Sequence, residues 1–173
     1  MIYSRFNVMS PIRLLTIDDA SLFVEIRRLS LCTDPDSFSA RPETDAWSKL
    51  ETARQRFSTA TLENGPFVLG AFDPNLVGVI GLIRATPVAA RVWGFYVRPE
   101  CRGGGVGRAL VQRAIEVARR MPGVARVELG VADKSIAARH VYSQSGFRET
   151  GFDAKSGGHD MILELTAAPG VSV

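Results

Sequence analysis

The sequence contains little of what several protein classes require. Among its 173 residues there are only two cysteines, Cys32 and Cys101, and two histidines. Two cysteines form neither a disulfide framework nor a zinc site, so we expect two reduced thiols and no bound metal. No apolar run approaches the ~20 residues that cross a bilayer. A membrane-spanning protein, a disulfide-rich secreted domain and a zinc module are therefore not expected.

The charge and the beginning of the chain exclude further classes. The net charge is +3, which lacks the dense basic stripe of a nucleic-acid binder, so neither nucleic acid nor membrane is an expected partner. The first 20 residues have no clean apolar stretch and include Asp18 and Asp19, which predicts a cytoplasmic protein without a signal peptide. The length suits one domain over residues 1–173, with residues 1–10 as an extra N-terminal or disordered segment.

Apolar spacing predicts the order strand, two helices, three strands, helix, strand, helix and two strands. The expected strands are residues 12–16, 66–73, 77–85, 90–97, 125–131, 146–153 and 160–166, and the expected helices are residues 18–31, 43–59, 105–121 and 135–145. The early hairpins imply antiparallel pairing, and the late strand–helix–strand unit implies one parallel pair. The pattern therefore predicts a mixed α/β sheet with helices on both faces.

The most unusual stretch is "VRPECRGGGVG", residues 97–107, which joins an apolar strand to a long helix. The first amides of a helix have no partner within it, and the helix dipole places partial positive charge there. Glycines at that end let a ligand approach the backbone closely, so the arrangement predicts a phosphate-binding loop. Arg102 and Arg108 flank the loop and would add charge-assisted hydrogen bonds.

Three phosphate-binding patterns compete for this loop. A P-loop requires G-x-x-x-x-G-K-[ST], and Arg108 and Ala109 break it. A dinucleotide fingerprint requires G-x-G-x-x-G, and Arg108 stands where its third glycine belongs. A pyrophosphate loop of the form [RQ]-x-x-G-x-[GA] is matched in full by Arg102, Gly105 and Gly107.

A second segment, "LGVADKSIAARHVYSQSGF", follows at residues 129–147. With the glycine loop, it resembles the GCN5-related N-acetyltransferase (GNAT) superfamily over most of the chain, through Leu129, Val131, Ala138, Tyr142, Gly146 and Phe147. Two motifs at the right separation are far more specific than one glycine loop. The resemblance implies a mainly antiparallel seven-stranded sheet whose fourth and fifth strands are parallel and splayed apart.

The resemblance implies acetyl-CoA as cosubstrate and no metal. The fourth strand would bind pantetheine, and the amides of the glycine loop would hold the pyrophosphate. Ser135 stands where relatives often have Asn, which puts one cofactor contact in doubt. The candidate cofactor-binding residues are Phe95, Tyr96, Val97, Arg102, Gly103, Gly104, Gly105, Val106, Gly107, Arg108, Ser135 and Tyr142.

The implied chemistry needs a proton donor and a base. Tyr142 is the candidate general acid for the leaving thiolate. The base stays open, because the fourth strand contains no acidic residue: His159, Glu128 and a water-mediated path are the alternatives. Acidic residues in or beside the loop between the first two helices would border the acceptor and either attract a cationic amine or only cap turns; these are Asp34, Asp36 and Glu43.

These residues predict an acyl-CoA-dependent N-acyltransferase that moves acetyl from acetyl-CoA to a primary amine by direct attack in a ternary complex. The alternative is a catalytically inactive CoA-binding module. The acceptor is a small-molecule amine or a protein or peptide amine, and the sequence does not distinguish them. Homodimers are common in the family, and nothing in the sequence requires one.

Overall fold

A computed structural model describes residues 11–165 as one seven-stranded sheet with the strand order β1-β2-β3-β4-β5-β7-β6. The predicted segment 1–10 and the last residue of the predicted final strand, Thr166, lie outside the described residues. The predicted order of helices and strands is confirmed. The strands are β1 (Ile12–Leu14), β2 (Phe67–Asp73), β3 (Asn75–Thr86), β4 (Ala89–Val97), β5 (Arg126–Ala132), β6 (Arg148–Asp153) and β7 (Gly158–Glu164); the helices are α1 (Ala20–Thr33), α2 (Leu50–Thr59), α3 (Val106–Arg120) and α4 (Ile136–Gln144).

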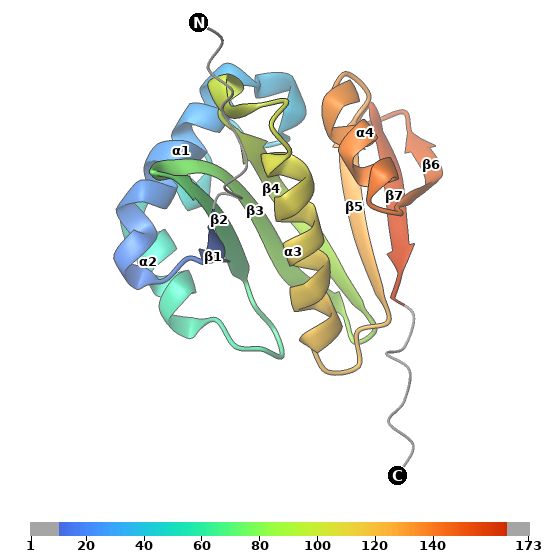
Figure 1. The fold of residues 1–173 in the computed structure, drawn as a ribbon, viewed down its shortest axis with the longest axis horizontal. Coiled ribbons are helices and arrows are strands. Elements are labelled where there is room, and N and C mark those ends of the chain that lie inside the picture. Colours follow the sequence, from blue (N-terminus) through green and yellow to red (C-terminus); the bar gives the residue numbers. More distant parts are fainter. Residues whose placement is uncertain (1–10, 166–173) are drawn as a thin grey trace, which may run out of the picture.

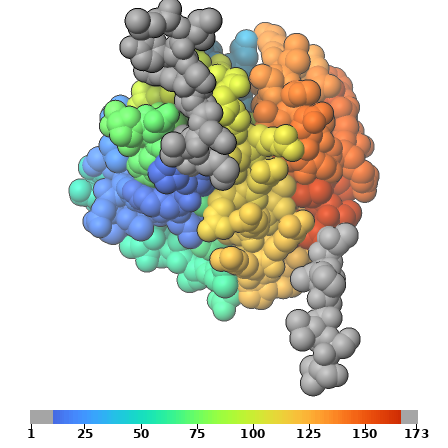
Figure 2. Space-filling view, viewed as in Figure 1, coloured from blue at the N-terminus to red at the C-terminus, as the bar shows by residue number. Residues whose placement is uncertain are grey.

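The helices cover both faces of the sheet, because each presents one apolar stripe to it. Helices α1 and α2 pack on one face around Phe23, Ile26 and Ala53. Helices α3 and α4 pack on the other face, where Leu110 and Tyr142 belong to the larger core. Figure 1 shows α3 crossing one face of the sheet while α1 and α2 lie to its other side. In the space-filling view, α3 and the orange α4 region lie side by side (Figure 2).

Every strand pair is antiparallel except β4 with β5. These two strands pair in parallel only from Ala89 opposite Arg126 to Arg91 opposite Glu128, and no pairing continues beyond Arg91. The prediction of a mainly antiparallel sheet with parallel, splayed fourth and fifth strands is therefore confirmed. Beyond Arg91, the edge of β4 that faces β5 therefore has no neighbouring strand with which its backbone groups can form hydrogen bonds.

Strand β4 also contains a bulge. Tyr96 lies opposite Val79 and Trp93 lies opposite Gly81, so two β4 residues between them face a single β3 residue. Gly94 at this point has φ +61°, a conformation that side chains rarely adopt. A glycine inside a strand pattern signals such a bulge, and the sequence analysis did not use that signal.

The second helix begins later than predicted. The prediction started it at residue 43, but residues Ala46–Ser48 form a short 3₁₀ turn and α2 starts at Leu50. The reason is tertiary: Arg27 of α1 binds the Asp45 carboxylate, and Arg28 donates to the carbonyl of Ser48 at 3.1 Å. None of the helices within residues 11–165 is long and apolar enough to cross a membrane.

Candidate active site

A cleft of about 480 Å³ opens where β4 and β5 part. Its walls are β4 from Val92 to Val97, the glycine-rich loop that follows, the first half of α4 and the loop after α1. The first three segments are close because the sheet order places β4 beside β5, and each of these two strands is followed by a helix on the same face. Ten of the twelve candidate cofactor residues line it; Gly104 and Val106 belong to the same loop without being part of the lining.

The glycine-rich loop presents a row of free backbone donors. The amides from Gly103 to Arg108 have no hydrogen-bond partner within the described residues; the next one, of Ala109, donates to the Gly105 carbonyl at 3.0 Å. Gly103 and Gly105 have φ of +78° and +85°. A side chain at either position would meet no atom within 4 Å, so the loop is open on that side. A run of unpaired amides at a helix N-terminus fits an anionic phosphate group.

Gly107 is required for a different reason. Its conformation is ordinary, but a Cβ there would lie 3.1 Å from the tip of the Phe95 ring, tighter than side chains normally pack. The first turn of α3 therefore presses directly against β4. This contact places the free amides beside the cleft, next to the part of β4 that no longer pairs with β5.

The two arginines that flank the loop differ in their surroundings. The Arg102 guanidinium donates to the Val97 carbonyl at 2.8 Å and to the Asp34 carboxylate at 2.5 Å, so its charge is already paired. Arg108 lines the cleft and makes no ion pair or side-chain hydrogen bond within the described part of the chain. Arg108 is thus the flanking cation that remains available to an anionic ligand.

Tyr142 lies inside the cleft wall, held between two aromatic rings. Its ring centroid is 5.5 Å from that of Phe95 and 5.6 Å from that of Phe147. The hydroxyl group makes no hydrogen bond within residues 11–165, although it belongs to a residue only 4% exposed. Burial raises the pKa of Tyr142 well above its usual value. The phenol therefore stays protonated at neutral pH and keeps a proton that it can donate.

His159, one candidate base, is held between two carboxylates. Its Nδ1 lies 2.7 Å from Glu149 and its Nε2 lies 2.7 Å from Asp133. These hydrogen bonds, first with Asp133 and then with Glu149, raise the pKa of His159. Both ring nitrogens donate in the protonated form, so the imidazolium has no lone pair to accept a proton. The residue is not among those that line the cleft.

Glu128, the other candidate base, is also bound to cations. Its carboxylate lies 2.7 Å from the Arg126 side chain and 3.7 Å from that of Arg91. Glu128 stands where β4 and β5 still pair, outside the lining of the cleft. The structure thus brings Tyr142 and the glycine loop together, but it brings neither candidate base to them.

The acidic loop after α1 spans the mouth of the cleft. Asp34 binds Arg102, Asp36 binds Lys134 at 3.1 Å, and Ser37 shares a hydrogen bond of 2.8 Å with Ser135. The loop therefore contacts both the glycine-rich loop and the segment before α4. Ser135 occupies the N-cap position of α4 as expected, but its hydroxyl makes no capping hydrogen bond because it is bound to Ser37.

Glu43, the third acidic candidate, is exposed and makes no ion pair within the described residues. Tyr96 is buried, and its hydroxyl lies 2.9 Å from Thr33 Oγ1. Since Thr33 gives its own proton to the Leu29 carbonyl, the Tyr96 hydroxyl donates to Thr33. Glu43 lies outside the lining of the cleft and the Tyr96 hydroxyl is bound to Thr33, so neither provides a free base in the cleft.

Motif reasoning missed the aromatic end of the cleft. Phe38, Trp93 and Gly94 line it on the side of α1 and α2. Trp93 stacks on Trp47 with ring centroids 4.5 Å apart. Two features of the sequence could have revealed this end of the cleft: the glycine within the fourth strand and the apolar residues on either side of it.

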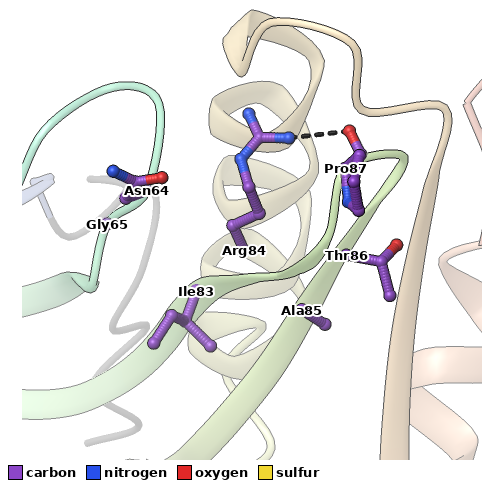
Figure 3. A pocket seen from close by; sticks show the side chains of 7 residues that line it. All are labelled: Asn64, Gly65, Ile83, Arg84, Ala85, Thr86 and Pro87. Atoms are coloured by element: carbon purple, nitrogen blue, oxygen red, sulfur yellow. Dashed lines mark hydrogen bonds between the residues drawn. The ribbon is translucent and has the colours of Figure 1, made fainter.

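A second pocket, of about 620 Å³, lies beside the β3–β4 turn at the other end of β4 (Figure 3). Its most polar group, the Arg84 guanidinium, is used by the fold: it donates to the carbonyls of Glu63, Pro87 and Pro122. Arg84 thereby holds three chain segments together, and the pocket provides no free charged group for a ligand.

Comparisons with known proteins agree with this geometry. A model of the acetyltransferase (GNAT) family matches residues 24–147. Mycothiol acetyltransferase of Beutenbergia cavernae is 37% identical over 98 residues, covering 50% of this chain and 33% of that protein. The uncharacterized N-acetyltransferase YvbK of Bacillus subtilis is 29% identical over 102 residues, covering 59% of this chain and 62% of that protein. The matches thus span less than two thirds of these curated relatives.

Among solved structures, the PaiA N-acetyltransferase of Thermoplasma acidophilum, in complex with coenzyme A, superposes with a TM-score of 0.73. The two sequences are 22% identical, and the superposition covers 91% of this chain and 100% of that one. The likeness shows a common fold, and the family match covers most of the described residues. The chain belongs to the GNAT acetyltransferase family.

Proposed function

We propose that this protein is an N-acetyltransferase that moves the acetyl group of acetyl-CoA to a primary amine by direct attack in a ternary complex. The observation that carries the proposal is the row of six unpartnered amides, Gly103 to Arg108, at the mouth of a cleft that also holds the Tyr142 ring. Family membership supports it, because acetyltransfer is the activity by which the family is named. The acceptor is a small-molecule amine or a protein or peptide amine.

Successive segments of the cleft suit successive parts of the acetyl-CoA molecule. The amides of the glycine loop and the Arg108 side chain would bind the pyrophosphate. The unpaired edge of β4, from Phe95 to Val97, would bind the amide groups of pantetheine. Arg102 would act indirectly, because its guanidinium holds the Val97 carbonyl and Asp34 and thereby fixes the loop.

Bound acetyl-CoA supplies a thioester whose carbonyl carbon accepts the amine. As the nitrogen–carbon bond forms, the carbon–sulfur bond breaks, and the amine proton must leave while the thiolate gains one. The Tyr142 hydroxyl, kept protonated by burial and without a partner within residues 11–165, would donate its proton to the thiolate. A main-chain amide of β4 near the Gly94 bulge would stabilise the negative charge that develops on the acyl oxygen.

The amine proton leaves through water in this proposal. The lining of the cleft contains one carboxylate among the described residues, Asp34, and that group is paired with Arg102. His159 is bound by two carboxylates and Glu128 by two arginines. A water path therefore agrees better with these contacts than either side chain acting directly.

The same lack of a free base favours one competing function, a CoA-binding module without activity. Tyr142 argues against it, because a binding module has no need for an unpaired phenol inside the cleft. Titration calorimetry with acetyl-CoA, with NAD as the control ligand, tests binding, and Gly105→Glu should abolish it by adding a negative charge beside the amides. Thiol release with a panel of amines then tests activity. Binding without release for any amine would leave only the binding module.

A further inference from the structure

Arg27 on α1 is a buried arginine with one unused nitrogen. Its side chain is 7% exposed and binds the Asp45 carboxylate through Nε at 3.0 Å and Nη2 at 3.1 Å. Nη1 has no hydrogen-bond partner, and it is the one fully buried side-chain nitrogen or oxygen in residues 11–165 that lacks one. A buried charged donor without a partner is costly, so its retention requires an explanation.

The unused nitrogen lies directly behind the wall at one end of the cleft, and Arg27 itself is not among the lining residues. The guanidinium carbon is 5.1 Å from the centroid of the Phe38 ring and 6.0 Å from that of Trp93. A Cβ at Gly94 would lie 3.6 Å from Nη1 and, apart from its own chain neighbours, would meet no other atom within 4 Å. Phe38, Trp93 and Gly94 all line the cleft. Nη1 therefore faces the small space over Gly94, at the β4 bulge and on the side of the sheet opposite the Phe95 ring.

The remaining charges make this end of the cleft unsuited to a polycation. The two acidic residues of the loop across the mouth, Asp34 and Asp36, are already paired with Arg102 and Lys134. No unpaired carboxylate lines the cleft within the described part of the chain. An acceptor with several ammonium groups would find no partner for them, whereas an acceptor that carries a carboxylate would find the free Arg27 nitrogen.

We propose that Arg27 is a specificity-determining residue that binds a carboxylate of the acceptor, so that the acceptor is an amino-acid-like amine. One carboxylate oxygen would lie over the Gly94 backbone within hydrogen-bond distance of Nη1, and the apolar part would lie against Phe38 and Trp93. Asp45 holds the guanidinium in place through its other two nitrogens. This inference rests on the proposed acetyltransferase function and defines its substrate class.

The test compares amines in matched pairs that differ only by the carboxylate: phenylalanine with 2-phenylethylamine, leucine with isoamylamine, and methionine with 3-(methylthio)propylamine. Spermidine serves as the polycation. For at least one pair the wild-type protein should show a kcat/KM at least about tenfold higher for the amino acid, equivalent to about 1.4 kcal/mol. A preference for the decarboxylated amines or for spermidine would overturn the inference, as would the absence of turnover of every amino acid.

Arg27→Lys tests the residue itself. Lysine keeps a positive charge beside Asp45, but its single nitrogen cannot replace the three donor nitrogens of a guanidinium. The substitution should raise KM for the amino acid and remove the preference, while the Kd for acetyl-CoA is unchanged. Arg28→Lys, on the next residue of α1, is the matched control and should keep the preference. If Arg27→Lys does not fold, the matched amine pairs still test the inference on the wild-type protein, which must prefer the amino acid in at least one pair.

The outcomes separate this inference from the function on which it rests. If acetyl-CoA does not bind, the acetyltransferase proposal fails first. If acetyl-CoA binds and amines are acetylated, but Arg27→Lys keeps the same ratio of kcat/KM values as Arg28→Lys, only the role of Arg27 is refuted. Nη1 would then serve the fold alone.

Discussion

Replacing Gly105 by alanine tests why the chain places glycines where β4 leads into α3. Gly105 is the N-cap of α3 with φ +85°, and a Cβ there would meet nothing within 4 Å. The cost of Gly105→Ala is therefore conformational strain without steric overlap. Gly104 offers a matched control, because it is equally open and its φ lies outside the left-handed region.

The expected magnitudes follow from these two conformations. An L-residue in the left-handed region costs roughly 1–2 kcal/mol. Where the backbone suits it, replacing glycine by alanine stabilises by about 0.4–1 kcal/mol, because the unfolded chain has fewer conformations. Because both variants share this gain, it cancels in the comparison, and Gly105→Ala should be less stable than Gly104→Ala by about 1–2 kcal/mol. At roughly 2–4 °C per kcal/mol for a chain of this size, the melting temperatures should differ by at least about 2 °C.

Thermal unfolding and calorimetric titration with acetyl-CoA measure both consequences. If the strained loop relaxes in Gly105→Ala, binding must restore it, and 1–2 kcal/mol corresponds to a Kd about 5- to 30-fold weaker. Equal melting temperatures for the two variants would refute the strain argument. An unchanged Kd in Gly105→Ala would show that the left-handed conformation is not needed for the ligand.

Three further predictions concern single side chains. Tyr142→Phe should fold normally, because its hydroxyl has no protein partner within residues 11–165, and it should lower kcat about 100-fold in amine acetylation while acetyl-CoA still binds. Asp19, whose pKa is lowered to about 2 first by its hydrogen bonds with Arg13, should contribute about 1–2 kcal/mol above pH ~4 and lose this as the pH falls toward 2, measured by urea unfolding against Asp19→Asn. His159 has a raised pKa, so its two hydrogen bonds to carboxylates should stabilise the fold fully below the unfolded pKa of about 6.5. That contribution should disappear as the pH rises through the folded pKa, seen as a fall in melting temperature that His159→Gln does not show.

Each of these predictions has an outcome that contradicts it. Wild-type kcat in Tyr142→Phe would show that the ring only packs against its neighbours. A flat difference between wild type and Asp19→Asn from pH 2 to about pH 5 would show that the ion pair with Arg13 is fully screened. An NMR titration in which the His159 imidazole deprotonates below about pH 6.5 would mean that the two carboxylates do not hold its proton.

The free amides of the glycine-rich loop follow from the sequence of that segment alone. Any helix that starts at residue 106 leaves its first amides without partners, and the glycines before it permit the two positive φ values. Tyr142 and the glycine loop were likewise found by motif spacing, and the antiparallel hairpins and the one parallel pair followed from the order of elements along the chain. These features depend on neighbours within a few residues, or on connection lengths, and both are written directly in the chain.

The electrostatics of the site depended on residues far apart in the sequence. The sequence shows that Asp34 and Asp36 carry charge, but not that Arg102 and Lys134, 68 and 98 residues away, neutralise them. His159 was a candidate base by its ordinary pKa, and only the pairing of β7 with β5 and β6 brings the two carboxylates to it.

Arg27 shows in one residue what the local sequence determines and what tertiary packing decides. Its position four residues after Phe23 places it on the apolar face of α1, which periodicity alone could have revealed. That the loop before α2 returns to supply Asp45, and that Nη1 is left facing Gly94, was decided by tertiary packing. The sequence by itself determined the fold class, the glycine loop with its free amides and the position of the tyrosine, because these rest on local conformation and spacing. Only the tertiary structure decided which charges remain free, because an ion pair depends on distance in space and not along the chain.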